Sequence, residues 1–433
     1  MVLRNFKENK SIKMTNRRGF IKSGALAVFG MGLNTLPAYV LKAANAFTQN
    51  IGNKRKILIV IFQRGAMDGL MAVSPFNDPF LKKARPTLMM SPSKNGDNGL
   101  FDLDGRFGLH TGFSSLYPLF QKNELAIIHG VGSPNKTRSH FDAQDYMESG
   151  TPFSKSTDSG WLNRTSGLME KVNSPFRAVS ITRSMPRSYY GDNPTLTISN
   201  LDDLRLKNRN PSSNAMLTAK SFEDLYDQTA NALMSETGKE TFEAMDMVSK
   251  IQSGAYKPHN DAVYPKSELG KSLMQLAQLI RSDVGLQIGF AESTGWDTHF
   301  NQGTSNGIFA RNASDLGNSV SAFWQDLGAD WQEHVVVMTM TEFGRTVKQN
   351  GTGGTDHGRA SCYFLLGKNV NGGKVHGNVT DLDPANLDEG RDLMVTTDFR
   401  SVFEEVAKKQ LNISNNGIIF PDWKSKGIGL MKG

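Results

Sequence analysis

The sequence predicts an α/β protein, a three-layer sandwich with a mostly parallel central sheet. Two observations lead to this prediction. Short apolar runs rich in β-branched residues recur along the chain, and helix-like stretches separate several of them. Uninterrupted runs of this kind are typical of strands buried on both faces, and strands that alternate with helices favour a parallel sheet between two helical layers. A chain of 433 residues is also long enough to bury one large core.

Six apolar runs are the predicted strands, and two helix-like stretches, residues 267–282 and 309–327, each precede one of them. Residues 86–108 are rich in Pro, Ser, Asn, Asp and Gly, which predicts a long surface excursion. Residues 204–265 are polar, with apolar residues at roughly helical spacing, and predict an inserted helical cap; a plain surface elaboration is the alternative. The predicted strands are residues 57–62, 125–131, 178–182, 286–291, 335–340 and 362–366.

The N-terminal residues have the pattern of an export signal. Residues 16–22, NRRGFIK, place paired arginines before an apolar residue and a lysine, and a moderately apolar stretch follows. Glycine, asparagine and proline interrupt that stretch, so it is too short and too broken to span a bilayer, and it ends on the small residues 44–46. We expect a twin-arginine signal peptide over residues 1–46, handled by the twin-arginine translocase. An uncleaved anchor or a chance arginine pair is the alternative.

The expected mature domain, residues 47–433, would then lie in the periplasm or outside the cell with no stable membrane span. Its charge excludes one class of partner. The whole chain has a formal net charge of +7, but residues 1–46 hold eight Lys or Arg and one Glu, leaving 41 basic and 41 acidic residues in the mature part. A mature part with no net charge gives no indication of the clustered basic surface that binds nucleic acid. The single cysteine, Cys362, lies in an apolar run and is expected to be a small buried hydrophobe.

In an open α/β sheet, ligands bind beyond the carboxyl ends of the strands, so the polar residues that follow each apolar run are the candidate site. Asp68 follows the first strand and is a candidate metal ligand or, equally, a turn or helix-cap aspartate. Ser139 lies where a helix should begin, with Asp142 three residues later, as in an N-cap. The alternative is a hydroxyl nucleophile activated at a helix start beside a cation. His140 is ambiguous between ligand, base and helix surface.

Carboxylates and imidazoles recur after three further strands. Asp297 and His299 follow the strand that ends at residue 291, and Glu342 follows the one that ends at residue 340. Asp356 and His357 lie in a glycine-rich loop before the last run. Oxygen mixed with imidazole suits zinc, manganese or iron, whereas an oxygen cluster without histidine would suggest magnesium or calcium. The sequence therefore predicts a divalent metal site at this edge of the sheet.

These motifs resemble those of the domain-of-unknown-function family 1501, whose members are typically exported bacterial proteins. The resemblance covers nearly the whole expected mature chain. The family is similar in turn to the alkaline phosphatase and sulfatase-like superfamily, which implies an alkaline-phosphatase-like sandwich. The motifs that carry the resemblance are Asp68-Gly69, residues 138–142 (RSHFD), 295–299 (GWDTH), 341–345 (TEFGR) and 354–358 (GTDHG).

The superfamily pattern implies, in chain order, an aspartate after the first strand, a Ser or Thr nucleophile at a helix start, an Asp with a His, an Asp-His pair and a late His. Two departures affect the expected metal content. The spacing from Asp297 to His299 is shorter than usual, and Glu342 with Phe343 replaces the Asp-His pair, which removes one imidazole. His140 or Asp356 would supply a missing ligand. The positions in the expected order are Asp68, Ser139, Asp297 with His299, Glu342 and His357.

The leading hypothesis is an exported, metal-dependent hydrolase or transferase of phosphate or sulfate esters, acting on a small anionic ester or an envelope glycan or lipid. Ser139 would attack, one or two ions would bind the ester, with zinc first and manganese, iron or calcium as alternatives, and arginines would clamp the remaining oxygens. The competing hypothesis is a non-catalytic envelope binding or assembly protein on the same scaffold. The candidate clamps are Arg138, Arg345 and Arg359.

Overall fold

A computed structural model describes residues 55–94, 96–170, 172, 174–201, 256–414, 417–423 and 427–432. The expected signal peptide and residues 204–255 of the expected cap lie outside these ranges. Residues 256–265, the described end of the expected cap, form turns and irregular backbone and contain no helix. Their anchor is the buried carboxylate of Asp326, which accepts hydrogen bonds from the hydroxyls of Tyr256 and Tyr264.

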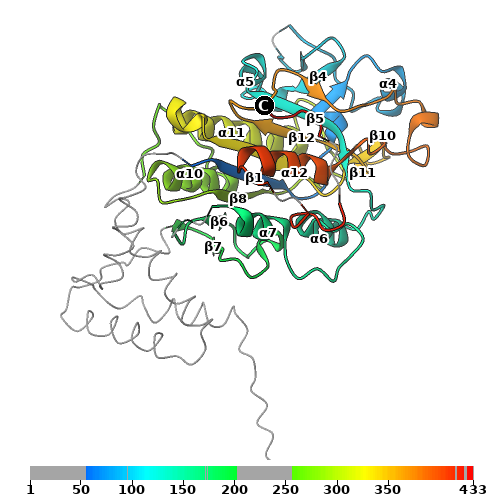
Figure 1. The fold of residues 1–433 in the computed structure, drawn as a ribbon. Helices are drawn as coiled ribbons and strands as arrows, with labels where there is room; N and C mark the ends of the chain where they lie inside the picture. The colour runs from blue at the N-terminus through cyan, green and yellow to red at the C-terminus, as the bar shows by residue number, and fades with distance from the viewer. Residues whose placement is uncertain are drawn as a thin grey trace, which may run out of the picture. The chain divides into compact units, whose positions relative to one another are not determined.

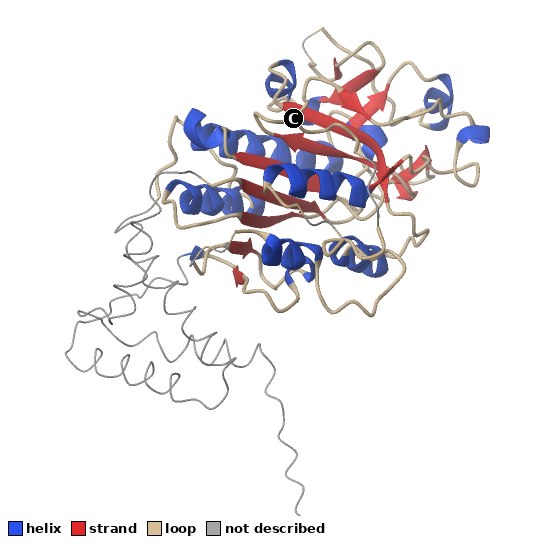
Figure 2. Cartoon of the chain, viewed as in Figure 1, coloured by secondary structure: helices blue, strands red, loops and turns tan. Residues whose placement is uncertain are grey.

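The core of the fold is a nine-stranded sheet with helices on both faces (Figures 1 and 2), which confirms the predicted α/β class. The strand order is β13-β5-β12-β9-β1-β8-β6-β7, and β14 pairs with β5. All pairings are parallel except those of β12, which runs antiparallel to β5 and β9. The strands are β1 (Ile57–Gln63), β5 (Leu125–Gly132), β6 (Ala178–Ile181), β7 (Leu196–Ile198), β8 (Ile288–Ser293), β9 (Val335–Met340), β12 (Ser361–Leu366), β13 (Val375–His376) and β14 (Thr397–Asp398).

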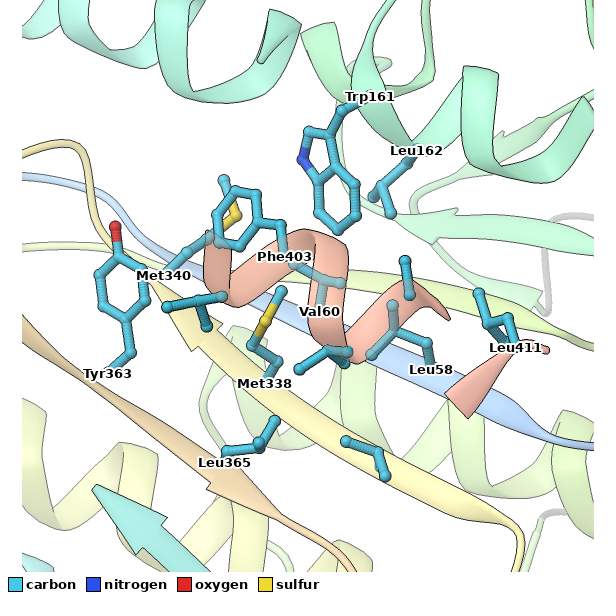
Figure 3. Close-up of a cluster of buried hydrophobic side chains, with 14 of the residues drawn as sticks. Leu58, Val60, Trp161, Leu162, Met338, Met340, Tyr363, Leu365, Phe403 and Leu411 are labelled. Atoms are coloured by element: carbon cyan, nitrogen blue, oxygen red, sulfur yellow. The ribbon is translucent and has the colours of Figure 1, made fainter. Parts of the chain in front are cut away.

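Strand β1 is fully buried because alternate side chains serve two different helical layers. On one face, Leu58 and Val60 join a cluster with Phe403 of α12 (Phe399–Gln410) and with side chains of α6 (His140–Ser149) and α7 (Trp161–Leu168), as Figure 3 shows in part. On the other face, Ile59 and Leu276 of α10 (Glu268–Arg281) both lie over Gly289. Helix α11 (Ile308–Gln332) packs beside α10. The chain therefore forms three layers.

The segment predicted as a surface excursion is more ordered than expected. Residues 86–108 include β3 (Leu100–Asp102) and the start of β4 (Phe107–His110), which form a small antiparallel sheet with β2 (Val73–Pro75). Leu100 and Phe107 of this sheet are buried, and the Phe107 ring lies against that of His129 in β5. The short helices α3 (Gly69–Ala72), α4 (Pro79–Ala84) and α5 (Tyr117–Gln121) connect these elements, and β10 (Arg345–Gln349) pairs with β11 (Thr355–His357). Among the described helices, none combines the length and the apolar character that a membrane crossing requires.

Candidate metal centre

The loops that carry the candidate residues meet at one edge of the main sheet. Strands β1, β8 and β9 are parallel, and their carboxyl ends are paired, Gln63 with Ser293 and Phe62 with Met340. Strand β12 runs the other way, so its first residue, Ser361, lies at the same edge, opposite Val131 near the end of β5. The segments after β1, β5, β8 and β9 and the segment before β12 are therefore neighbours.

Three histidines converge on one carboxylate oxygen at this edge. The Nε2 atoms of His299, His357 and His140 lie 3.2, 3.3 and 3.5 Å from Oδ1 of Asp297. The Nε2 atoms of His299 and His357 are 2.9 Å apart. The ligand atoms of His140, Asp297 and His357 all lie within 4.8 Å of one another, the separation expected around one shared ion. All four residues were predicted from the sequence as metal ligands.

Each of these histidines is oriented by a hydrogen bond on the opposite side of its ring. Because a carboxylate or carbonyl oxygen can only accept, Nδ1 carries the proton and Nε2 presents its lone pair to the centre. Metal-binding histidines typically have such a partner. The Nδ1 atoms donate from His140 to Glu342 at 2.8 Å, from His299 to Asp356 at 3.0 Å, and from His357 to the carbonyl of Arg138 at 2.8 Å.

This arrangement changes the expected role of Glu342 and Asp356. Both were predicted as ligands, and both contact a histidine on the side away from the centre instead. Glu342 is fully buried, and its Oε1 accepts from the backbone N–H of Gly65 and from Gln144 as well as from His140. Burial would raise the pKa of Glu342, but these hydrogen bonds outweigh it and lower the pKa. A buried anion thus supports His140.

The same hydrogen-bond chain includes residues that the sequence analysis did not identify. Gln144 donates to Glu342 through Nε2 at 2.9 Å and accepts from Arg64 through Oε1 at 2.9 Å. Arg64 also donates to Glu148 at 2.9 Å and to Glu292 at 2.7 Å. His140, Gln144 and Glu148 are spaced by four residues on α6, so they share one face of that helix. That spacing was the signal available in the sequence.

The four residues fit a divalent ion. The Nε2 atom of His140 is buried and has no hydrogen-bond partner within the described structure, although it points to the centre. Without an ion, two Nε2 atoms at 2.9 Å form a hydrogen bond only if one ring takes the other tautomer or carries a proton on both nitrogens. A donor set of three imidazole nitrogens and one carboxylate oxygen suits zinc and also manganese or iron. Within the described ranges, His140, Asp297 and His357 satisfy the mutual spacing of a single-ion site, and His299 adds a fourth donor through its contacts with Asp297 and His357.

Arg345 supports the centre from its buried side through hydrogen bonds, and its guanidinium is not free to bind substrate. Its guanidinium is fully buried and donates to the carbonyls of Gly65, Ala66 and Thr355 and to Oδ1 of Asp297 at 2.6 Å. Partial burial alone would raise the pKa of Asp297, but the hydrogen bond and charge of Arg345 bring it to about 2. Arg345 was predicted as an oxygen clamp; it instead joins three loops and keeps Asp297 ionised.

The turn after β1 depends on a glycine. Gly65 has φ +114°, and a Cβ atom added there would lie 2.6 Å from the backbone nitrogen of Asp297. The conformation is one that residues with a side chain rarely adopt, and no room exists for a side chain. This close approach lets the Gly65 N–H reach Glu342 while its carbonyl accepts from Arg345.

Asp68, predicted as a metal ligand, does not reach the centre. It is buried and caps α3, and its two oxygens accept from Arg85 at 2.8 and 3.1 Å. Its Oδ2 also accepts from Gln302, whose own carbonyl oxygen accepts from the hydroxyls of Thr298 and Thr355. Asp68 therefore braces the two loops that carry His299 and His357. The turn or cap alternative describes its position.

The remaining predicted residues surround the centre and contact protein. Ser139 is the N-cap of α6, and its hydroxyl accepts from the backbone of Asp142 at a long 3.5 Å. Arg138 pairs with Asp392 and Glu389, although its carbonyl holds His357. Arg359 pairs with Asp388 at 2.9 Å and is nearly buried. The three predicted arginine clamps are thus engaged by the protein itself.

The comparison with solved structures gives weak likenesses of about 10% identity. The chain is similar to the PsFucS1 sulfatase from Pseudoalteromonas sp., at 11% identity and a TM-score of 0.37 over 92% of this chain and 78% of that one. It is also similar to the lipoteichoic acid synthase LtaP from Listeria monocytogenes, at 11% identity, a TM-score of 0.33, and 91% and 82% coverage. A third is the phosphonate monoester hydrolase of Agrobacterium radiobacter, at 9%, 0.30, and 86% and 79%.

No curated protein matches the chain. The family described as "Protein of unknown function (DUF1501)" matches residues 122–418, more than half of the sequence. The match includes the four residues of the centre, His140, Asp297, His299 and His357. Asp68 and the turn after β1 precede the matched range. This chain belongs to the DUF1501 family.

Proposed function

We propose that this protein is an exported, metal-dependent hydrolase of phosphate or sulfate esters, or a transferase of the same groups. The observation that supports it is the convergence of three Nε2 atoms and the Asp297 carboxylate, with every Nδ1 atom held by an oxygen. A structural histidine would not need a buried, unpartnered Nε2 atom such as that of His140. The ester class follows from the order of the motifs along the chain.

The centre is open enough to receive a substrate. The side chain of Asp297 is 46% exposed, and those of His299 and His357 are 29% and 23% exposed. A divalent ion bound here would supply Lewis acidity for a phosphoryl or sulfuryl oxygen. The chain's own part is to fix the ligands: Glu342 and Asp356 hold two imidazoles, and Arg345 keeps Asp297 in its ionised form.

Ser139 is the proposed attacking group. Its hydroxyl precedes His140 directly at the start of α6, and the contact that it accepts from Asp142 is long, so its own proton and a lone pair remain available. The new bond would form from Oγ to phosphorus or sulfur as the bond to the leaving oxygen breaks, with the hydroxyl proton passing through solvent to that oxygen. Water would then attack the same atom, release phosphate or sulfate and return a proton to Oγ. The positive end of the helix favours the negative charge that develops on this oxygen.

Export rests on the leader pattern of residues 16–22 and the small residues 44–46. The twin-arginine translocase carries folded proteins, which suits an ion loaded before export. The proposed location is therefore the periplasm or the exterior, with a small anionic ester or an envelope glycan or lipid as substrate. Amino-terminal sequencing of the protein recovered from the periplasm tests this; a start near Phe47 is expected, and an intact leader would contradict it.

The first test of the proposed function is the metal content of the protein purified without chelators. We expect about one equivalent of zinc, manganese or iron in the wild type, by elemental analysis, and loss of it in the Asp297→Ala, His357→Ala double variant. Retained metal would then justify a screen of phosphate and sulfate esters. A folded wild type with no metal would refute the hydrolase and favour the non-catalytic binding protein on the same scaffold.

A further inference from the structure

A tight turn at residues 388–392 lies against the centre and carries a partly exposed arginine. The turn is closed by a bridge between Asp388 and Asp392, and Asp392 also bridges to Thr346 of β10. Strand β10 pairs with β11, and in this pairing Arg345 of β10 lies opposite His357 of β11. The turn is thus one strand away from a residue of the metal centre, and the family match includes it.

The guanidinium of Arg391 reaches the backbone of a centre residue. Its Nη2 donates a hydrogen bond to the carbonyl of His357, and its Nε lies 3.3 Å from Oδ1 of Asp392. Nη2 of Arg391 therefore lies at most about 11 Å from Nε2 of His357, which is the sum of the hydrogen bond to the carbonyl and the covalent bonds from that carbonyl to the ring. The side chain of Arg391 is 43% exposed while it contacts the backbone of a centre residue.

Arg391 differs from the other basic residues around it because its own ion pair engages it less strongly. Arg345 is buried on the inner side of the centre. The guanidinium of Arg359 donates hydrogen bonds to Asp388 and to the carbonyl of Ser133. Arg138 takes the second oxygen of Asp392, at 2.6 Å. Arg391 therefore shares its carboxylate with a closer cation, and the Oδ1 atom that it faces makes no hydrogen bond within the described structure.

Within the charged network of this turn, the shortest ion pair of Arg391, at 3.3 Å, is longer than the shortest ion pairs of Lys136, Arg138 and Arg359. Arg391 is the basic side chain of this network that combines exposure with contact to the centre, and, together with the hydrogen bond from Asn350, its charge helps to lower the pKa of Asp356. A guanidinium presents parallel N–H donors that match two oxygens of a tetrahedral oxyanion. The members of the network are Lys136, Arg138, Arg359, Arg391, Asp388, Glu389 and Asp392.

We propose that Arg391 forms the oxyanion subsite of this protein and binds the outer oxygens of a phosphate or sulfate group whose inner oxygen faces the metal centre. The inference rests on the metal centre of the proposed function and names the recognition group for its substrate class. It replaces the three arginines predicted from the sequence. Arg391 would bind the anion directly, and its contact with the metal ligand His357 is to the backbone carbonyl and not to the imidazole ring.

The test uses the full protein loaded with one equivalent of Co²⁺, verified by elemental analysis, and titrated with inorganic phosphate and with sulfate in a calorimeter. In Arg391→Gln we expect the Kd of the better anion to rise about tenfold or more, as expected for a lost hydrogen bond to a charged group. Arg391→Lys should recover part of the affinity, because the charge remains without the fork. Arg183→Gln is the matched control, since Arg183 is 86% exposed and pairs with Glu268.

The outcomes separate this inference from the proposed function. Unchanged cobalt content and melting temperature with weakened anion binding in Arg391→Gln would support the subsite. Tighter binding of phosphate or of sulfate in the wild type would assign the subsite to that group. Equal anion affinity in Arg391→Gln and a metal-loaded wild type would overturn the subsite alone. A wild type that binds no metal would overturn the metal centre and the subsite together.

Discussion

The Nη2 atom of Arg345 lies 2.6 Å from Oδ1 of Asp297, the same oxygen that three imidazole nitrogens approach. One buried cation therefore sets the charge and the position of the central carboxylate. Because Arg345 also donates to carbonyls in the loops after β1 and before β12, it connects the position of Asp297 to the position of His357. The four residues of the centre lie after β5, after β8 and before β12, and this side chain contacts the last two segments as well as the loop after β1.

Arg345→Met should destabilise the protein more than any surface charge substitution. It leaves the Asp297 carboxylate and several buried carbonyls without donors, and breaking a buried pair in this way costs about 3–5 kcal/mol. Because the side chain of Asp297 is about half exposed, solvent screens this pair, and the expected loss of unfolding free energy lies toward the lower end of that range. Urea unfolding of the metal-free protein measures it, with Arg183→Met as the exposed control. A loss below 1 kcal/mol would show that Arg345 is not a brace.

Glu342→Gln should weaken metal binding without unfolding the protein. The amide can still accept from His140, but it lacks the negative charge that increases the basicity of the imidazole. We expect the metal dissociation constant to rise about 10- to 100-fold, measured by competition with a chromogenic chelator. The matched control is Glu124→Gln. Glu124 directly precedes β5, at the edge of the sheet opposite the centre, and its carboxylate pairs with Lys368. Similar affinities in the two variants would contradict the supporting role of Glu342.

The main sheet was predictable because its central strands are buried on both faces. All six predicted runs are strands of this sheet, and β1 is apolar over six consecutive residues for that reason. The strands β7, β13 and β14 were not predicted, since they have two or three residues and are partly exposed. The small sheet of β2, β3 and β4 was missed because its turns dominate the composition of residues 86–108.

The residues of the centre followed from their place at strand ends, whereas their individual roles did not. Spacing cannot tell whether a carboxylate faces an ion or the far side of an imidazole, as Glu342 and Asp356 do. The partners of Arg138 and Arg359 come from the turn at residues 388–392, which no local pattern connects to them. Fold and approximate site are therefore local properties of this sequence, and hydrogen-bond partners are not.

Two substitutions of Ser139 separate its capping role from its proposed attack on the ester. Ser139→Ala removes both the cap and the hydroxyl, so it should lower the free energy of unfolding by about 1 kcal/mol and abolish turnover. Ser139→Asn keeps a capping oxygen without the nucleophile, so it should retain stability and still lack turnover. Metal content should be intact in both. Wild-type turnover by Ser139→Asn would leave Ser139 with the cap alone.

The buried histidines His110 and His129 should make the fold sensitive to acid. In each ring Nε2 donates to a backbone carbonyl and Nδ1 accepts a backbone N–H, so a second proton would face a donor. Burial lowers the pKa of both to about 4, against about 6.5 in an unfolded chain. Between these values the unfolded state binds more protons, so the stabilisation is complete above about pH 6.5 and is lost as the pH falls toward 4.

Each of these histidines should contribute about 1.4 kcal/mol per pH unit to the slope of unfolding free energy within that window. Urea unfolding at pH 7, 6 and 5, with EDTA present to exclude metal release, gives the slope for the wild type. His129→Gln should reduce the slope by that amount whatever it does to absolute stability, because the other titrating groups remain. His110→Gln should reduce it equally. Parallel stability curves for the wild type and both variants would show that these rings already titrate normally in the folded protein.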